Sequence, residues 1–148
     1  LDAVPAGPST LVGSLLEPLM RRGEVAGAPL GHPWGDAGTL GRFLAVSAGL
    51  LAGCWPFALP PGRLLAPAGP GRGAVLVAEG AVLEPGAVVA GPVLLDAGSR
   101  VGAGAVVTRA VVGPGATVAA GATVTGSVLG PGATVAPGSV VAAGLLPG

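Results

Sequence analysis

An aliphatic residue recurs every six positions between residues 77 and 141, and this period constrains the fold more than any other feature of the chain. Small side chains and glycines recur between these residues in almost every unit. Two steps, 107–111 and 124–128, are five residues long instead of six. A short fixed period of this kind indicates a solenoid, in which each unit packs on its neighbours. The recurring residues are Val77, Leu83, Val89, Leu95, Val101, Val107, Val112, Val118, Val124, Leu129, Val135 and Val141.

A unit of six residues has room for one very short strand and one turn. Glycine accepts backbone angles that a Cβ atom forbids, so it marks the corner between units. The aliphatic residue points inward, and its counterparts in adjacent coils stack on it at the strand spacing of roughly 4.8 Å. Three units make one triangular coil, and the two five-residue units occupy the same place in successive coils. We therefore expect one inner edge to be formed by Val77, Leu95, Val112 and Leu129, and we expect Val101, Val118 and Val135 to be buried.

Units such as Val101-Gly-Ala-Gly-Ala-Val and Val118-Ala-Ala-Gly-Ala-Thr resemble the hexapeptide-repeat left-handed parallel β-helix. This resemblance covers about half of the chain and implies a mostly β fold for residues 74–148. The left hand is implied by the resemblance alone, because general connection rules favour right-handed crossovers.

The composition excludes several other classes of protein. Gly and Pro together make up 45 residues, but half of the chain is apolar and its net charge is zero, so we expect a packed core rather than disorder. No charged residue follows Arg109, yet Gly or Pro interrupts this stretch in nearly every unit, which argues against a membrane span. The absence of a basic run argues against nucleic-acid binding. A lone cysteine, Cys54, and the lack of a signal peptide favour a cytoplasmic location.

Residues 1–53 contain no hexads and have a mixed α and β pattern. We expect a first helix that starts at Ser9 as N-cap, is broken or kinked at Pro18 and ends at Gly23. Residues 24–30 are expected to form a short strand, and Thr39 is expected to cap a second helix. The apolar face of that helix is Leu40, Phe43, Leu44, Leu50 and Leu51. Elements of this size bury too little surface to be stable alone. Since the chain also begins at Leu1 without an initiator Met, we expect a fragment of a longer protein.

The segment Gly31-His-Pro-Trp34-Gly-Asp36-Ala-Gly38-Thr39, followed by a helix with Phe43-Leu44, is similar to the W-x-D-x-G-T segment of sugar-nucleotide pyrophosphorylases. Motif, helix and hexads occur in the order typical of the mannose-1-phosphate guanylyltransferase-like branch. The resemblance implies that 1–53 is the C-terminal end of a Rossmann-like nucleotidyltransferase domain, 54–73 a Pro/Gly-rich linker, and 74–148 a β-helix for oligomerisation or regulation. The implied substrates are a sugar 1-phosphate and a nucleoside triphosphate, and the implied product is a nucleotide sugar.

The chain departs from this family at several places. The Gly-rich nucleotide loop and the sugar-phosphate lysine of the family belong upstream, and this chain has no Lys at all. Leu40 stands where Pro is common, and Ala37 stands where Ile is common. We therefore expect the 148 residues alone to be inactive, with no catalytic or cofactor-binding residue of their own.

Asp36 is the one residue to which the resemblance assigns chemistry. The equivalent Asp of the family helps to hold the Mg²⁺ that bridges the nucleotide phosphates, and a hard dication prefers carboxylate oxygens. The alternative is that Asp36 only shapes the turn before Thr39. For Gly38 and Thr39 we expect turn and cap roles.

The other candidate residues are assigned no chemistry. His32, the only histidine, lies in a Gly-Pro loop more than forty residues before the first unit, so we expect a surface residue rather than a general base. Trp55, Pro56 and Phe57 are expected to pin the linker to one domain. The arginines are too scattered to predict an anion site; they include Arg63, Arg72, Arg100 and Arg109.

Two other functions remain open. A hexapeptide acyltransferase using acetyl-CoA is disfavoured because residues 74–148 contain no His and no long loop for a pocket. A non-enzymatic β-helix scaffold is compatible with the hexads and also with an enzyme that uses an inert β-helix to oligomerise. In each case the nearly uncharged coils favour a homo-oligomer, because exposed strand edges must be covered or paired.

Overall fold

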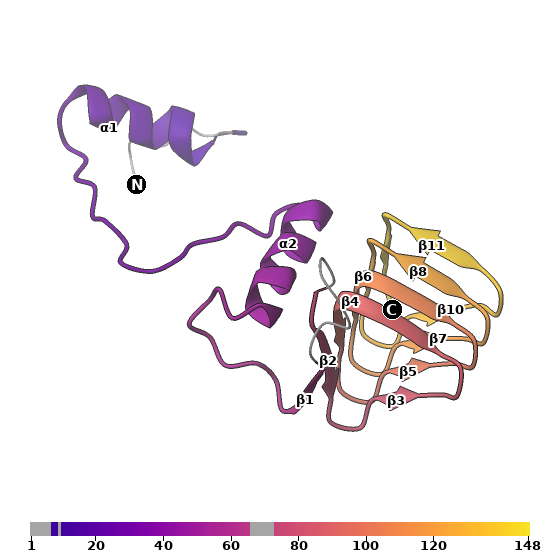
Figure 1. The fold of residues 1–148 in the computed structure, drawn as a ribbon. Helices are drawn as coiled ribbons and strands as arrows, with labels where there is room; N and C mark the ends of the chain where they lie inside the picture. Colours follow the sequence, from indigo (N-terminus) through magenta and orange to yellow (C-terminus); the bar gives the residue numbers. More distant parts are fainter. Residues whose placement is uncertain (1–6, 9, 66–72) are drawn as a thin grey trace. The chain divides into compact units, whose positions relative to one another are not determined.

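A computed structural model describes residues 7, 8, 10–65 and 73–148 of the chain (Figure 1). It divides into two compact units, Leu1–His32 and Pro33–Gly148. The domain limits 1–53, 54–73 and 74–148 remain predictions.

The first unit contains one helical segment of two parts. A π-helical stretch, η1 (Val12–Leu16), runs into a short α-helix, α1 (Glu17–Arg21), and the change of helix type comes directly before Pro18. Proline lacks an N–H and crowds the carbonyl of the preceding turn, and a change of helix type beside it accommodates both effects. Gly23, at φ +71°, follows the helix as predicted. The predicted N-cap Ser9 lies outside the described residues.

The chain that follows α1 contains a surface ion pair but no regular secondary structure. Arg22 Nε donates to Glu24 Oε1 over 2.9 Å, and this hydrogen bond lowers the pKa of Glu24. The strand predicted over 24–30 is wrong: these residues are exposed and form neither strand nor helix. A strand needs a neighbour for its backbone groups, and Gly27 and Pro29 are poor strand formers.

The second unit is a β-solenoid of about four turns, which confirms the mostly β prediction at this level. Its short strands stack coil upon coil (Figure 1). The strands are β2 (Val75–Ala78), β3 (Val82–Leu83), β4 (Val88–Leu95), β5 (Arg100–Val101), β6 (Val106–Val112), β7 (Thr117–Val118), β8 (Thr123–Thr125), β9 (Val128–Leu129), β10 (Thr134–Val135), β11 (Val140–Ala142) and β12 (Leu145–Leu146).

The strand register places the recurring aliphatic residues in three parallel columns. The first column confirms the predicted edge and adds one member: Val77, Leu95, Val112, Leu129 and Leu146. The second column contains Leu83, Val101, Val118 and Val135. The third column contains Val89, Val107, Val124 and Val141. Every hexad therefore contributes one residue to a column, as the period predicts.

These columns form the core. The predicted inward residues Val101 and Val118 have no exposed surface and Val135 has 2 %. Between the columns, the small side chains of Ala105, Ala116 and Ala122 are also fully buried. The column members at the two ends of the stack are only partly buried, whereas a substitution in the middle coils changes both packing and solvation.

Five-residue units close one corner of the coil more tightly than six-residue units. In β4 the two residues Gly91 and Pro92 lie opposite the single Arg109 of β6, where the register shifts. In the later coils the same corner is turned by Arg109, Gly126 and Ala143, all at positive φ of 46°, 57° and 49°. We call these three residues the corner row.

One outer face of the solenoid is apolar in every coil. Its outward residues lie in register one position before the first column, and we call them the outer row: Leu76, Leu94, Val111, Val128 and Leu145. The corresponding outward residues of β3, β5, β7 and β10 are Val82, Arg100, Thr117 and Thr134, and we call the last three the polar face. The outer row therefore needs a cover that the polar face does not need.

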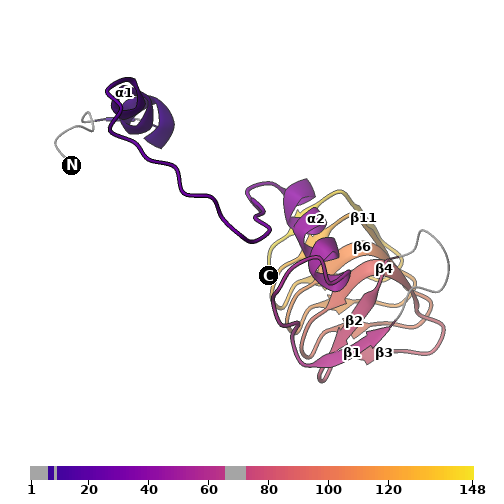
Figure 2. The same cartoon turned by 60° about the vertical axis from the view of Figure 1, so that its left-hand side comes forward.

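Helix α2 (Leu40–Leu51) supplies part of this cover. It packs on β4 and β6, and both views show it lying along this side of the coils (Figures 1 and 2). Leu76 is 1 % and Val111 7 % exposed, whereas Leu145, at the far end of the outer row, is 68 % exposed. A further strand, β1 (Gly62–Leu65), pairs antiparallel with β2. The second predicted helix thus exists and packs on the solenoid.

Candidate functional site

The segment before α2 holds Asp36 in a compact turn. Asp36 Oδ1 accepts a hydrogen bond of 2.8 Å from the Gly38 backbone N–H. Its other oxygen, Oδ2, accepts from Arg42 Nη1, one turn into α2. Thr39 is the N-cap of α2, and its hydroxyl accepts from the Arg42 N–H at 3.3 Å. Gly38 and Thr39 therefore have the turn and cap roles predicted for them.

In the part of the chain that the structure describes, the Asp36 carboxylate is occupied by its own turn and by α2. Both carboxylate oxygens are engaged by protein donors, and the arginine places a positive charge where a cation would bind. No group of three or more His, Cys, Asp or Glu side chains converges anywhere within residues 7, 8, 10–65 and 73–148. One paired carboxylate does not satisfy the octahedral demand of Mg²⁺. These residues do not fit a Mg²⁺ site by themselves, and the metal role of Asp36 stays a prediction.

Trp55 fixes the Asp36 segment against α2. A Cβ added at Gly49 would lie 2.4 Å from Trp55 Nε1, and one added at Gly35 would lie 2.7 Å from the same indole ring. The ring therefore occupies a slot between two residues without side chains. Phe57, by contrast, is 65 % exposed, and the free thiol of Cys54 is also exposed.

The remaining sequence candidates lie apart from one another. His32 is exposed in a stretch without regular structure. Arg100 donates to Glu84 Oε1 at 3.0 Å, and Glu84 Oε2 accepts from the Ala103 N–H at 3.1 Å, so this pair ties two coils together. Arg63 is exposed, and Arg72 lies outside the described residues. The structure brings none of these groups to a common catalytic centre.

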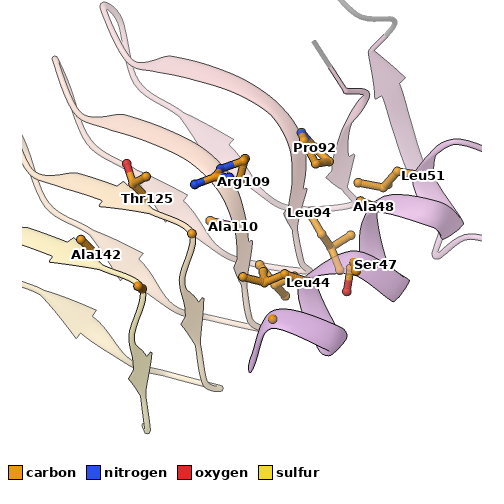
Figure 3. A pocket seen from close by; sticks show the side chains of 15 residues that line it. Leu44, Ser47, Ala48, Leu51, Pro92, Leu94, Arg109, Ala110, Thr125 and Ala142 are labelled. Atoms are coloured by element: carbon orange, nitrogen blue, oxygen red, sulfur yellow. The ribbon is translucent and has the colours of Figure 1, made fainter. Parts of the chain in front are cut away.

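A groove that the sequence analysis missed lies between α2 and the corner row (Figure 3). Its volume is about 520 Å³. One wall is α2, and the other is built from the corners and outer face of successive coils. The residues that line the groove are Gly41, Leu44, Ala45, Ser47, Ala48, Leu51, Pro92, Leu94, Arg109, Ala110, Val111, Thr125, Gly126, Ala142 and Ala143.

The hexads contained a signal for this groove. The position before each inward residue points outward, and the outer row is the one outward column that is Leu or Val in every coil. An outward aliphatic residue in each coil predicts a covered face, and α2 is the nearest amphipathic helix in the sequence. No comparable signal marks Arg109. Its place beside the groove depends on how the shortened units turn the corner in space.

Comparison of the chain with protein-family models, curated protein sequences and solved structures finds no match. Among the helices of the described residues, none has both the length and the hydropathy of a membrane span.

Proposed function

We propose that the chain is the C-terminal part of a sugar-1-phosphate nucleotidyltransferase, and that its solenoid is a hexapeptide left-handed β-helix serving assembly. The substrates would be a sugar 1-phosphate and a nucleoside triphosphate. The observation that carries the proposal is the continuity of the segment from Trp34 to Thr39 with α2, and of α2 with the solenoid. The family-like segment and the hexads share the compact unit Pro33–Gly148, in the order expected of the family.

The activity would need groups beyond those described. Transfer of a nucleotidyl group depends on positioned phosphates, cationic clamps and metal acting together. Of these, the described chain offers only the Asp36 carboxylate, and that group is held by Arg42. The Asp36 turn is therefore a supporting element of a catalytic domain whose other residues the proposal assigns to the preceding sequence.

Asp36→Asn tests this role in the protein that carries the preceding residues. Asn keeps an oxygen for the Gly38 N–H but loses the charge that faces Arg42. We expect Mg²⁺-dependent pyrophosphate release to fall by about tenfold or more, as for loss of a group that orients a metal site. Circular dichroism should show the solenoid intact.

The matched control for this substitution is Asp96→Asn. Asp96 also holds a turn, through a bond of 2.7 Å from the Ala97 N–H to its Oδ1, but it lies in the solenoid. Its substitution should leave turnover unchanged. An Asp36→Asn protein with unaltered turnover and unaltered metal dependence would leave Asp36 as a turn residue only.

Homo-oligomerisation is the second part of the proposal. At the end of the outer row, Leu145 and Val128 border a hollow of about 280 Å³ together with Phe43 of α2. Leu145 and Phe43 are 68 % and 38 % exposed. Exposed aliphatic and aromatic side chains that gather in one hollow favour association.

Leu145→Glu is expected to weaken self-association. Burial of one leucine contributes about 1.5–3 kcal/mol, so the dissociation constant should rise roughly tenfold to a hundredfold. Thr134→Glu, an outward substitution on the polar face, is the control and should have little effect. Light scattering across micromolar concentrations measures both. A wild-type chain that stays monomeric over this range would contradict the assembly role.

A further inference from the structure

The groove between α2 and the corner row has the size and lining of a small-molecule site. Ligand pockets occupy about 300–1,000 Å³ and are mostly apolar, with a few placed polar groups. This groove measures about 520 Å³ and is lined largely by Leu, Val, Ala, Gly and Pro. Figure 3 shows Leu44, Ala48 and Leu51 of α2 on one side and Arg109, Ala110 and Thr125 of the coils on the other.

The polar groups of the lining are few, which disfavours a sugar as the ligand. The Ser47 hydroxyl donates to the Phe43 carbonyl at 2.9 Å. The Thr125 hydroxyl is 3.0 Å from the Thr108 hydroxyl. Each hydroxyl already has one partner, so these two side chains are too few to replace the hydration of a ligand rich in hydroxyl groups. No aromatic side chain lines the groove to stack on a base or a sugar ring.

Within the described part of the chain, Arg109 is the only charged residue that lines the groove. Among the described residues its guanidinium has no ion pair and no side-chain hydrogen bond. A Cβ added at Gly126 would lie 3.7 Å from Arg109 Nη2, so the guanidinium extends over the bare corner of the next coil.

The backbone of Arg109 adds a second observation. Its φ of 46° lies in the left-handed region that favours glycine, and the next coil uses Gly126 at the same corner. Ala143 adopts a φ of 49° at the same corner two coils on, so the positive φ belongs to the corner, which accepts an arginine, a glycine or an alanine. The Arg109 side chain is exposed, so its guanidinium is open to an anion that approaches from solvent.

We propose that this groove binds an unbranched aliphatic carboxylate. The carboxylate would pair with the Arg109 guanidinium, whose planar fork matches its two oxygens. The hydrocarbon chain would lie along α2 against Leu44, Ala48 and Leu51. This site is independent of the nucleotidyltransferase proposal, because it uses neither Asp36 nor any preceding residue.

Octanoate is the probe for this site, and calorimetry of the 148-residue chain measures its binding below the concentrations at which micelles form. We expect one site with a dissociation constant of about millimolar or below. Octanol has the same chain without the charge and should bind at least about tenfold more weakly. Equal binding of octanol and octanoate, or no binding of octanoate, overturns the proposal.

Two variants locate the site. Arg109→Gly suits the positive φ and should leave the fold intact, yet weaken octanoate binding at least about tenfold, or about 1.4 kcal/mol. Ala48→Leu keeps Arg109 but fills the groove, so it should also weaken binding. Thr134→Ser, on the polar face, is the control and should leave octanoate binding unchanged. Octanoate affinity that is unchanged in Arg109→Gly or in Ala48→Leu contradicts the assignment.

Discussion

Val118→Asp is expected to unfold the solenoid. Val118 lies in the second column between Val101 and Val135 and has no exposed surface. A carboxylate at this position would have no partner, and burial of an unpaired charge costs several kcal/mol. That is a large share of the roughly 5–15 kcal/mol by which a domain is stable. Thermal unfolding followed by circular dichroism should show loss of the cooperative transition.

Thr117→Asp is the matched control, one residue away on the outer surface. Thr117 is half-buried and lies in register between Arg100 and Thr134, so an aspartate there would sit beside a guanidinium. We expect this variant to fold with nearly wild-type stability. Equal destabilisation by the two substitutions would show that residue 118 does not face a core.

The hexads predicted the solenoid because its period is local and its packing repeats. One inward residue per unit fixes the column to which that residue belongs, and the five-residue steps fix the register of later coils. The same arithmetic extends to Leu146, which completes the first column although the predicted run stopped at Val141. Repetition supplied the long-range contacts that a single sequence does not usually reveal.

The segments without repetition were harder to predict. Residues 24–30 have some strand-like composition but no pairing partner in the described structure, so the predicted strand is wrong. Strand β1 lies within the Pro/Gly-rich stretch, where turn residues concealed it, and it forms because β2 offers an open side. Pairing partners of this kind depend on tertiary structure, which local propensity does not encode.

The candidate site also has one part that follows from nearby residues and one part that depends on tertiary structure. The Asp36 turn, the Thr39 cap and the α2 boundaries follow from nearby residues, and the sequence indicated the turn and cap as alternatives to a metal role. The groove at Arg109 depends on three separate features: the covered outer row, the shortened units and the position of α2. Only their combination in space places one cation against an apolar wall.

We propose that these 148 residues serve assembly and that the catalytic chemistry resides in other parts of a longer protein. The most direct test is pyrophosphate release from nucleoside triphosphates, with Mg²⁺ and a panel of sugar 1-phosphates. The 148-residue chain and a longer protein that contains it are assayed separately under the same conditions. The account predicts release by the longer protein and none above background by the chain, because the chain contains no lysine, no nucleotide loop and a carboxylate already paired with Arg42. Release by the chain alone, or no release by the longer protein with any sugar 1-phosphate, would contradict it.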